Sequence, residues 1–133
     1  LKRGYSDEEI SHIYELGRLS LENGDLRRAE AIMGGLTEVA PDFASAWLGM
    51  AYIQIQSGDY ETALQLTRQA LKIDANFIEA MLYLVACFLT TGDFSSAGTY
   101  LGELGEMIES GVLDNPNMLR FYRTQLARYQ TRT

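Results

Sequence analysis

Histidine and cysteine are the side chains best suited to catalysis or metal binding, and this sequence holds one of each. His12 has four acidic residues nearby in the sequence, which are Asp7, Glu8, Glu9 and Glu15. A general base or a metal ligand needs partner groups at fixed geometry, and the sequence has no His, Cys and Asp constellation with such spacing. We therefore expect His12 to be a surface histidine.

Cys87 lies in the apolar stretch YLVACFL, which is typical of a buried structural thiol. A single cysteine forms no intramolecular disulfide, and this fits a reducing compartment such as the cytoplasm. The sequence also lacks a phosphate-binding glycine loop, a nucleophile elbow and a cluster with metal-ligand spacing. These features predict a protein that is not an enzyme and that uses no metal and no cofactor.

The chain carries a net charge of −7 at pH 7, and its charges are unevenly placed. Between Lys72 and Arg120 there is no Lys or Arg, while the same stretch holds Asp74, Glu79, Asp93, Glu103, Glu106, Glu109 and Asp114. An acidic chain without a basic stripe argues against nucleic-acid binding, because phosphate neutralisation supplies most of that affinity. No apolar run approaches the roughly 18 residues of a membrane span. Because the chain begins at Leu1 rather than Met, we expect it to be trimmed from a longer one.

Three Gly-Asp pairs recur at a fixed interval of 34 residues, with their glycines at Gly24, Gly58 and Gly92. Glycine can end a helix in the left-handed conformation, and the aspartate after it can cap the next helix. The apolar residues on both sides of each pair follow helical spacing. The sequence therefore predicts three antiparallel helix pairs over residues 10–43, 44–77 and 78–111 of a single domain spanning 1–133. Stacking such pairs forms one continuous core.

The repeat register and the flanking segments make further predictions. Leu16, Met50 and Leu84 share one column, and we expect all three to be buried between the helices of their pairs. A capping box over SDEE starts the first helix near Asp7. Asn115 as a cap and Pro116 in the first turn start a last helix over about residues 115–131, which is expected to cover the third repeat.

The second helix of the third repeat carries glycines at helical spacing, namely Gly98, Gly102 and Gly105. Each glycine inside a helix costs about 1 kcal/mol relative to alanine, so these positions need a compensating contact. We expect the C-terminal helix of the same chain to pack on them. The alternative occupant is a partner protein or a second copy of the chain in a homodimer.

This layout resembles the tetratricopeptide repeat. The matching residues are clearest in the middle repeat: Trp47, Met50-Ala51, Gly58-Asp59-Tyr60, Ala63, Ala70 and Asp74. The third repeat departs from the pattern after Ala97, because it lacks the closing Asp-Pro type of ending. The resemblance implies an all-α, right-handed superhelical solenoid of three helix pairs plus a C-terminal capping helix. It also implies a binding scaffold whose concave face is lined by the first helix of each pair.

Carried onto this chain, that concave face consists of Tyr14, Arg18, Leu21, Leu48, Tyr52, Ile55, Leu82, Tyr83, Ala86 and Leu89. Only Arg18 among these residues is charged, so the face is expected to be apolar with tyrosine hydroxyls. Such a face suits an extended apolar segment or the apolar side of an amphipathic helix from a partner protein. In the alternative interpretation, neighbouring helices partly bury these side chains.

The sequence also looks like the small cytosolic chaperones of bacterial type III secretion. The segment AWLGMAYIQIQSGDYETAL is similar to the middle repeat of the branch that holds translocator subunits. Another branch holds the needle subunit through an amphipathic helix. The resemblance implies a chaperone for one of these clients. The alternative is a structural scaffold or a self-associating subunit of a larger complex.

Overall fold

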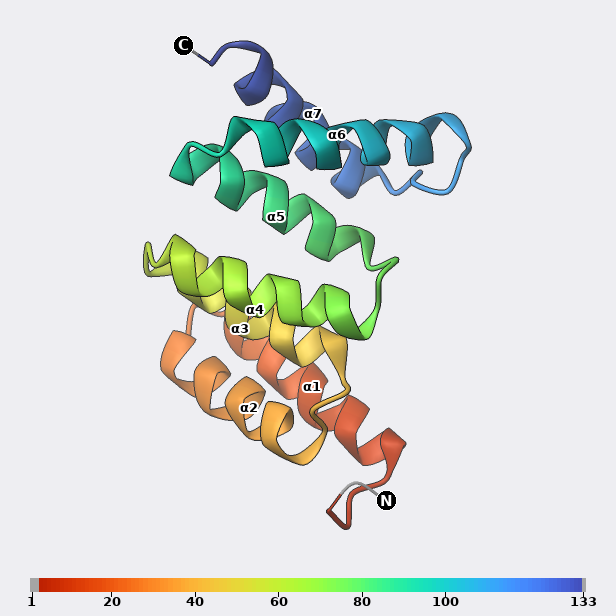
Figure 1. Cartoon of the computed structure of the whole chain (residues 1–133). Coiled ribbons are helices and arrows are strands. Elements are labelled where there is room, and N and C mark those ends of the chain that lie inside the picture. Colours follow the sequence, from red (N-terminus) through yellow and green to blue (C-terminus); the bar gives the residue numbers. More distant parts are fainter. Residues whose placement is uncertain (1–2, 133) are drawn as a thin grey trace. The chain divides into compact units, whose positions relative to one another are not determined.

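The computed structural model describes residues 3–132, which form helices and no β-strand (Figure 1). In chain order the helices are α1 (Asp7–Glu22), α2 (Leu26–Val39), α3 (Ala44–Gln56), α4 (Tyr60–Ile73), α5 (Ile78–Thr91), α6 (Phe94–Glu109) and α7 (Pro116–Gln130). The all-α prediction is confirmed, and each predicted repeat holds one pair of helices followed, after the third, by a terminal helix. Leu1, Lys2 and Thr133 lie outside the described residues.

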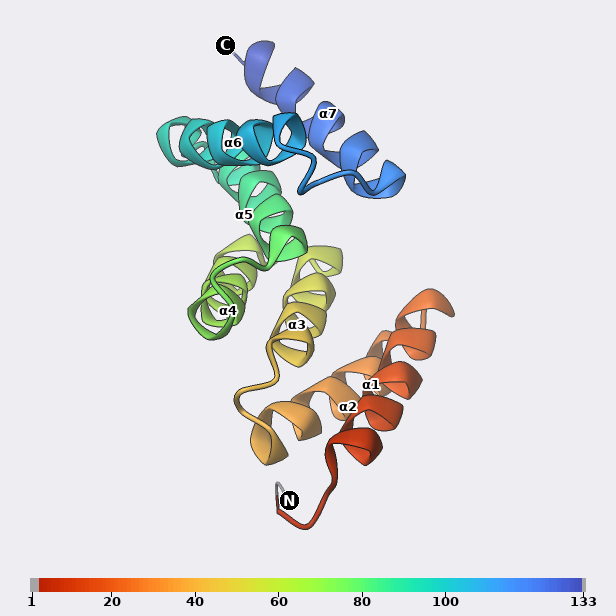
Figure 2. The same cartoon turned by 90° about the vertical axis from the view of Figure 1, so that its right-hand side faces the viewer.

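The helices fall into two compact units, one ending at Ala75 and the other beginning at Asn76. In the N-terminal unit, α2 packs against both α1 and α3, and α3 packs against α4. In the C-terminal unit, α7 lies against both α5 and α6 (Figure 2). Each unit therefore has a core of its own. The single domain expected over residues 1–133 stays a prediction.

The Gly-Asp pairs form the predicted junctions between helices. Gly24, Gly58 and Gly92 have φ angles of 76°, 82° and 86°, which lie in the left-handed region that favours glycine. The aspartate after each glycine is the N-cap of the next helix, with its side chain accepting from the backbone N–H three residues later: Asp25 from Arg28, Asp59 from Thr62 and Asp93 from Ser96. These contacts confirm that each pair ends one helix and starts the next.

The two outer helix starts also follow the sequence prediction. Ser6 accepts from the backbone N–H of Glu9, and the Glu9 carboxylate accepts in return from the backbone N–H of Ser6. These bonds lower the pKa of Glu9. At α7 the Asn115 side chain accepts from the backbone N–H groups of Asn117 and Met118, and Pro116 opens the helix.

Met33 of α2 is the central side chain of the N-terminal unit, and it is wholly buried. Glycines on the two flanking helices make room for it. A Cβ atom added to Gly17 of α1 would lie 2.9 Å from Met33 Cε, and one added to Gly49 of α3 would lie 2.8 Å from Met33 Sδ. The Met33 thioether therefore fills space that the side chain of any residue other than glycine would occupy at positions 17 and 49.

In the first two pairs, the buried face of the first helix lies one residue later than the sequence predicted. Leu84 is buried as expected, but Leu16 is 51% exposed and Met50 is half-buried, so full burial was wrong for these two. The buried column is instead Gly17, Ala51 and Val85. One residue turns a helix by about 100°, enough to move a side chain off the buried face. At Leu16, no earlier helix within residues 3–132 covers the outer side of α1.

Trp47 is the one tryptophan of the sequence, and it lies half-buried on α3. Its indole Nε1–H donates to the backbone carbonyl of Pro41, at 2.9 Å, in the segment between α2 and α3. The indole thus ties the start of the second helix pair to the end of the first pair.

The C-terminal unit is built around α5, whose buried residues are Ala80, Met81, Leu82, Leu84, Val85, Cys87, Phe88 and Leu89. Phe88 stacks on Tyr100 of α6, with ring centroids 6.2 Å apart. Helix α7 also contacts α5, because Arg128 of α7 donates to the Thr90 hydroxyl of α5, at 3.1 Å. Helix α5 is therefore packed against both of its neighbours in the unit.

Two of the glycines on α6 face tyrosines of α7. A Cβ atom added to Gly98 would lie 2.6 Å from the Tyr129 hydroxyl oxygen, and one added to Gly105 would lie 3.2 Å from the Tyr122 hydroxyl oxygen. A Cβ atom on Gly102 would meet nothing within 4 Å, and this residue is exposed. The C-terminal helix thus occupies the surface around Gly98 and Gly105. A homodimer contact at these glycines stays a prediction.

We expect alanine to have opposite effects at Gly98 and Gly102. Gly102→Ala should stabilise the protein by up to about 1 kcal/mol, because alanine is the better helix former and the added methyl group has free space. Gly98→Ala should destabilise it by about 1 kcal/mol or more, because the methyl group displaces the Tyr129 hydroxyl. Urea denaturation measures both free energies of unfolding. Equal shifts for the two variants would contradict the packing of α7 on Gly98.

Candidate partner-binding surfaces

The N-terminal unit contributes five of the expected apolar groove residues. Leu48 of α3 is only 4% exposed and belongs to the core. The other four are half-buried, namely Tyr14 and Leu21 on α1 and Tyr52 and Ile55 on α3. The Tyr14 ring also meets the Phe43 ring edge-on, with centroids 5.4 Å apart. Helices α1 and α3 are in contact, so these residues come from neighbouring elements.

Arg18, the one cation among the expected groove residues, pairs with carboxylates of its own helix. Its Nε lies 3.1 Å from Glu15 Oε2, and its Nη1 lies 2.5 Å from Glu22 Oε1. Glu15 and then Glu22 raise the pKa of the guanidinium. The side chain is exposed, so these pairs add little stability, but they balance its charge on the surface.

In the C-terminal unit, the expected groove residues lie on α5 and differ in burial. Leu82 and Leu89 are 2% and 7% exposed, whereas Tyr83 and Ala86 are half-buried. A partner cannot touch the two leucines without displacing other side chains, and the same holds for Leu48. For these three leucines the structure agrees with the alternative of burial by neighbouring helices. A groove role for the other seven residues stays a prediction.

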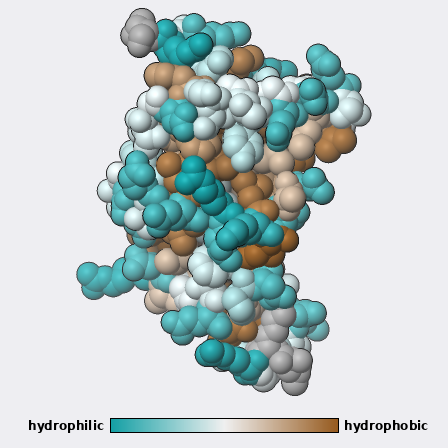
Figure 3. Space-filling view, viewed as in Figure 1, coloured by the Kyte–Doolittle hydropathy of each residue, from teal (hydrophilic) through white to brown (hydrophobic). Residues whose placement is uncertain are grey.

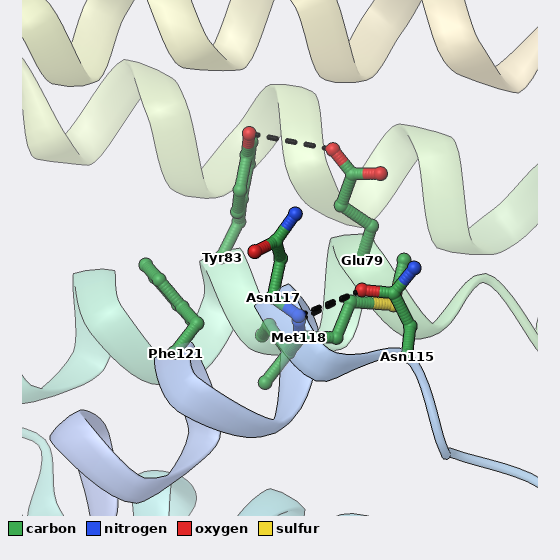
Figure 4. Close-up of a pocket in the computed structure, with 7 residues that line it drawn as sticks. Glu79, Tyr83, Asn115, Asn117, Met118 and Phe121 are labelled. Atoms are coloured by element: carbon green, nitrogen blue, oxygen red, sulfur yellow. Dashed lines mark hydrogen bonds between the residues drawn. The ribbon is translucent and has the colours of Figure 1, made fainter.

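A pocket of about 310 Å³ opens between the first turns of α5 and of α7 (Figure 4). It is lined by Glu79, Leu82, Tyr83, Asn115, Asn117, Met118 and Phe121. The Tyr83 hydroxyl donates to Glu79 Oε1 over 3.5 Å, and the Tyr83 ring lies 6.3 Å from the Phe121 ring. The pocket thus brings two expected groove residues together with residues of the terminal helix.

The residues that α7 adds to this pocket were not among the sequence-predicted sites. Asn117, Met118 and Phe121 belong to no motif that would mark them as binding residues. The sequence of α7 did contain one signal, because its apolar face is wider than contact with a single helix requires. Met118 and Phe121 lie toward α5, whereas Tyr122 reaches Gly105 of α6, so the helix has more apolar surface than one neighbour needs.

The described residues show little that could do catalytic or metal chemistry. His12 is exposed on α1. Within residues 3–132, no three His, Cys, Asp or Glu side chains gather where they could hold a metal ion. None of the described helices is both long and apolar enough to cross a membrane. On the face drawn in Figure 3, hydrophilic residues cover much of the surface and hydrophobic residues show between them.

Cys87 is wholly buried on α5, and burial raises the pKa of its thiol to about 11. Because the thiolate is the reactive form, we expect Cys87 to resist thiol reagents at pH 8 until the C-terminal unit opens. Labelling with a chromogenic disulfide should be slow in buffer and fast in denaturant. Stability should also fall as the pH rises from about 9 to 11, because the unfolded thiol ionises first. Rapid labelling of the native protein would contradict this burial.

Known proteins share this arrangement of helices. The Yersinia enterocolitica type III secretion chaperone SycD, solved with a peptide of the translocator YopD, is 16% identical with a TM-score of 0.78, over 94% of this chain and 92% of that one. PcrH of Pseudomonas aeruginosa, solved with the chaperone-binding region of PopD, is 21% identical with a TM-score of 0.78, over 96% of this chain and 92% of that one. These likenesses confirm the fold.

Comparison with known protein sequences and family models identifies the family of this chain. The peroxisomal targeting signal receptor of Saccharomyces cerevisiae is 30% identical over 94 residues, which are 70% of this chain. The chain spans only 15% of the length of that receptor. Two family models described as tetratricopeptide repeat match residues 14–76 and 54–107, and together they reach from α1 to α6. The chain belongs to the tetratricopeptide repeat family.

Proposed function

We propose that this chain is a protein-binding module that holds an apolar or amphipathic segment of a partner protein and catalyses no reaction. In its more specific form, the proposal is a cytoplasmic chaperone of type III secretion, with a translocator or needle subunit as the client. The segment binds on the first helices of the pairs.

The observation that carries the proposal is the chemistry of the accessible residues on α1 and α3. Tyr14, Leu21, Tyr52 and Ile55 are apolar or aromatic and half-buried, so each offers part of its surface to a partner. Arg18 already pairs with two carboxylates of α1. A surface of this kind favours apolar contacts with tyrosine hydroxyls at their edges over recognition of a charged peptide end.

The comparisons support the more specific form. SycD is a type III secretion chaperone solved with a translocator peptide, and PcrH was solved with a chaperone-binding region, so both hold a segment of another protein. This chain matches nearly the whole of each, at 92% of their length. The yeast receptor, of which it matches 15%, gives weaker guidance on function.

The proposal is tested with Tyr52→Ala. The partner is isolated by co-purification from the native host, and its binding segment is titrated into both proteins by calorimetry. Losing an aromatic contact of this kind costs about 2 kcal/mol, so we expect affinity to fall about thirtyfold. Circular dichroism should show unchanged helix content, because Tyr52 is only half-buried and lies outside the fully buried core. Unchanged affinity with preserved folding would move the site away from α3.

Arg18→Ala is the matched control on the neighbouring helix. Because the guanidinium pairs with Glu15 and Glu22 rather than standing free, we expect affinity to change by less than about twofold. A large loss in this variant with none in Tyr52→Ala would instead indicate recognition of an acidic segment.

A second candidate, a self-associating structural subunit, is favoured by the outer side of α1. Leu16 and Leu19 are 51% and 47% exposed there, and neighbouring exposed apolar residues are typical of contact surfaces. Sedimentation equilibrium separates the two functions. A structural subunit forms a fixed oligomer whatever peptide is added, and Leu16→Glu should dissociate it. A chaperone is stabilised by its client segment.

A further inference from the structure

The pocket between α5 and α7 combines an apolar interior with one carboxylate. The buried Leu82 lines it, and the half-buried Met118 and Phe121 of α7 lie across from α5 (Figure 4). Glu79 is the one charged residue among those that line the pocket. Figure 4 shows its carboxylate beside the Tyr83 hydroxyl, on the side of the pocket formed by α5.

No cation in the described part of the chain balances the Glu79 carboxylate. Its hydrogen-bond partner is the Tyr83 hydroxyl at 3.5 Å, a weak contact because O–H···O hydrogen bonds are ordinarily about 2.5–3.0 Å long. The sequence has no Lys or Arg from residue 73 to residue 119. Arg120, the first cation of α7, instead donates to Asn117 Oδ1, at 3.2 Å. The carboxylate is therefore available to a positive charge from outside the chain.

The start of α7 borders the same pocket, and helix N-termini favour anions. Here that preference is already met within the chain. Pro116 has no N–H group, and the Asn115 side chain accepts from the N–H groups of Asn117 and Met118, at 3.0 and 3.1 Å. An anion entering the pocket would also face Glu79. The pocket is therefore built to reject a negative group and to accept a positive one.

We infer that this pocket binds a Lys or Arg side chain of the partner segment, next to an apolar side chain that packs on Met118 and Phe121. The cation forms a charge-assisted hydrogen bond to Glu79 and lies against the Tyr83 ring. The volume of about 310 Å³ is at the lower end of ligand pockets, which suits one or two side chains rather than a whole helix. This inference rests on the proposed protein-binding function.

The first experiment selects peptides without knowing the natural partner. A phage-displayed library of random 12-residue peptides is panned against the full chain and against Glu79→Lys. We expect the full chain to enrich peptides in which Lys or Arg lies within two positions of a large apolar residue. Glu79→Lys should lose that preference and keep the apolar one, because only the charge on α5 has changed sign.

The second experiment measures one selected peptide by calorimetry. Glu79→Gln keeps the size of the side chain and removes its charge, and we expect affinity to fall about tenfold. Raising the salt concentration should weaken binding to the full chain more than binding to this variant. The matched control is Glu103→Gln, an exposed acid on α6 that does not line the pocket, for which affinity should stay the same.

The possible outcomes distinguish failure of the cation site from failure of the proposed protein-binding function. Apolar peptides that bind without a basic residue, or equally well to Glu79→Gln, overturn the cation site and leave the binding function standing. Enrichment of acidic peptides by the full chain also overturns it. If no peptide of the library binds the full chain better than it binds the bare support, both the cation site and the binding function are overturned. Thermal melts of each variant exclude loss of folding as the cause.

Discussion

Replacing Met33 by alanine should destabilise the N-terminal unit by about 2–5 kcal/mol. The residue is wholly buried between α1 and α3, and the glycines facing it have no side chains that could move into the cavity. The effect should therefore lie in the upper part of that range. Urea denaturation followed by tryptophan fluorescence measures it, because Trp47 lies in the same unit.

Gly49→Ala supplies the test of mechanism. Alone it should destabilise the protein by about 1–3 kcal/mol, because its methyl group collides with the Met33 sulfur. Combined with Met33→Ala, the same methyl group fills part of the cavity, so the two losses should not add. Leu16→Ala is the control and should change stability by less than about 0.5 kcal/mol, since Leu16 is half-exposed. Additive losses would contradict the contact.

Deleting the chain from Asn115 onward should have an effect of similar size on the C-terminal unit. Helix α7 covers Gly98 and Gly105 with tyrosines, and it packs Phe121 near Tyr83. Burying an apolar side chain contributes about 1.5–3 kcal/mol, so losing several half-buried ones removes roughly 5 kcal/mol. That is a large part of the stability of a small domain. We expect a much lower melting temperature and aggregation.

Arg128→Ala is the control for this deletion, because it keeps α7 and removes one hydrogen bond from α7 to Thr90 and one within α7 to Gln125. Its cost should be about 1 kcal/mol. Circular dichroism melts and size-exclusion chromatography compare the two variants. A truncated protein that stays monomeric and equally stable would show that α7 does not cover the unit. In that case α7 itself is the better candidate for the partner-binding element.

The helix junctions could be predicted from sequence because they depend on local contacts. A left-handed glycine followed by a capping aspartate involves only neighbouring residues, and the same applies to Asn115 and Pro116 at the start of α7. The buried register could not be predicted in this way. By hydrophobicity alone Leu16 is a better core residue than Gly17, yet Gly17 is buried because the Met33 side chain of α2 occupies the space beside it.

The pocket is a harder case for sequence analysis. Glu79 and Met118 lie far apart in the chain, and they meet only because α7 packs on α5 at one particular position. No period or motif encodes that position. For the same reason, the family resemblance placed Leu48 and Leu82 on the concave face, and the sequence could not decide between that and the alternative of burial, which the structure shows. Contacts between helices determine which side chains on each helix face remain accessible to a partner.

The indole of Trp47 and the thiol of Cys87 give the molecule an intrinsic reporter in each unit. Trp47 fluorescence follows the N-terminal unit, where its indole is held by the Pro41 carbonyl, and the accessibility of the Cys87 thiol follows the C-terminal unit. No engineered label is needed to compare the two along one denaturation curve. Coincident transitions mean all-or-none cooperativity across the repeats, whereas separate midpoints mean repeat-by-repeat unfolding, as in a one-dimensional array.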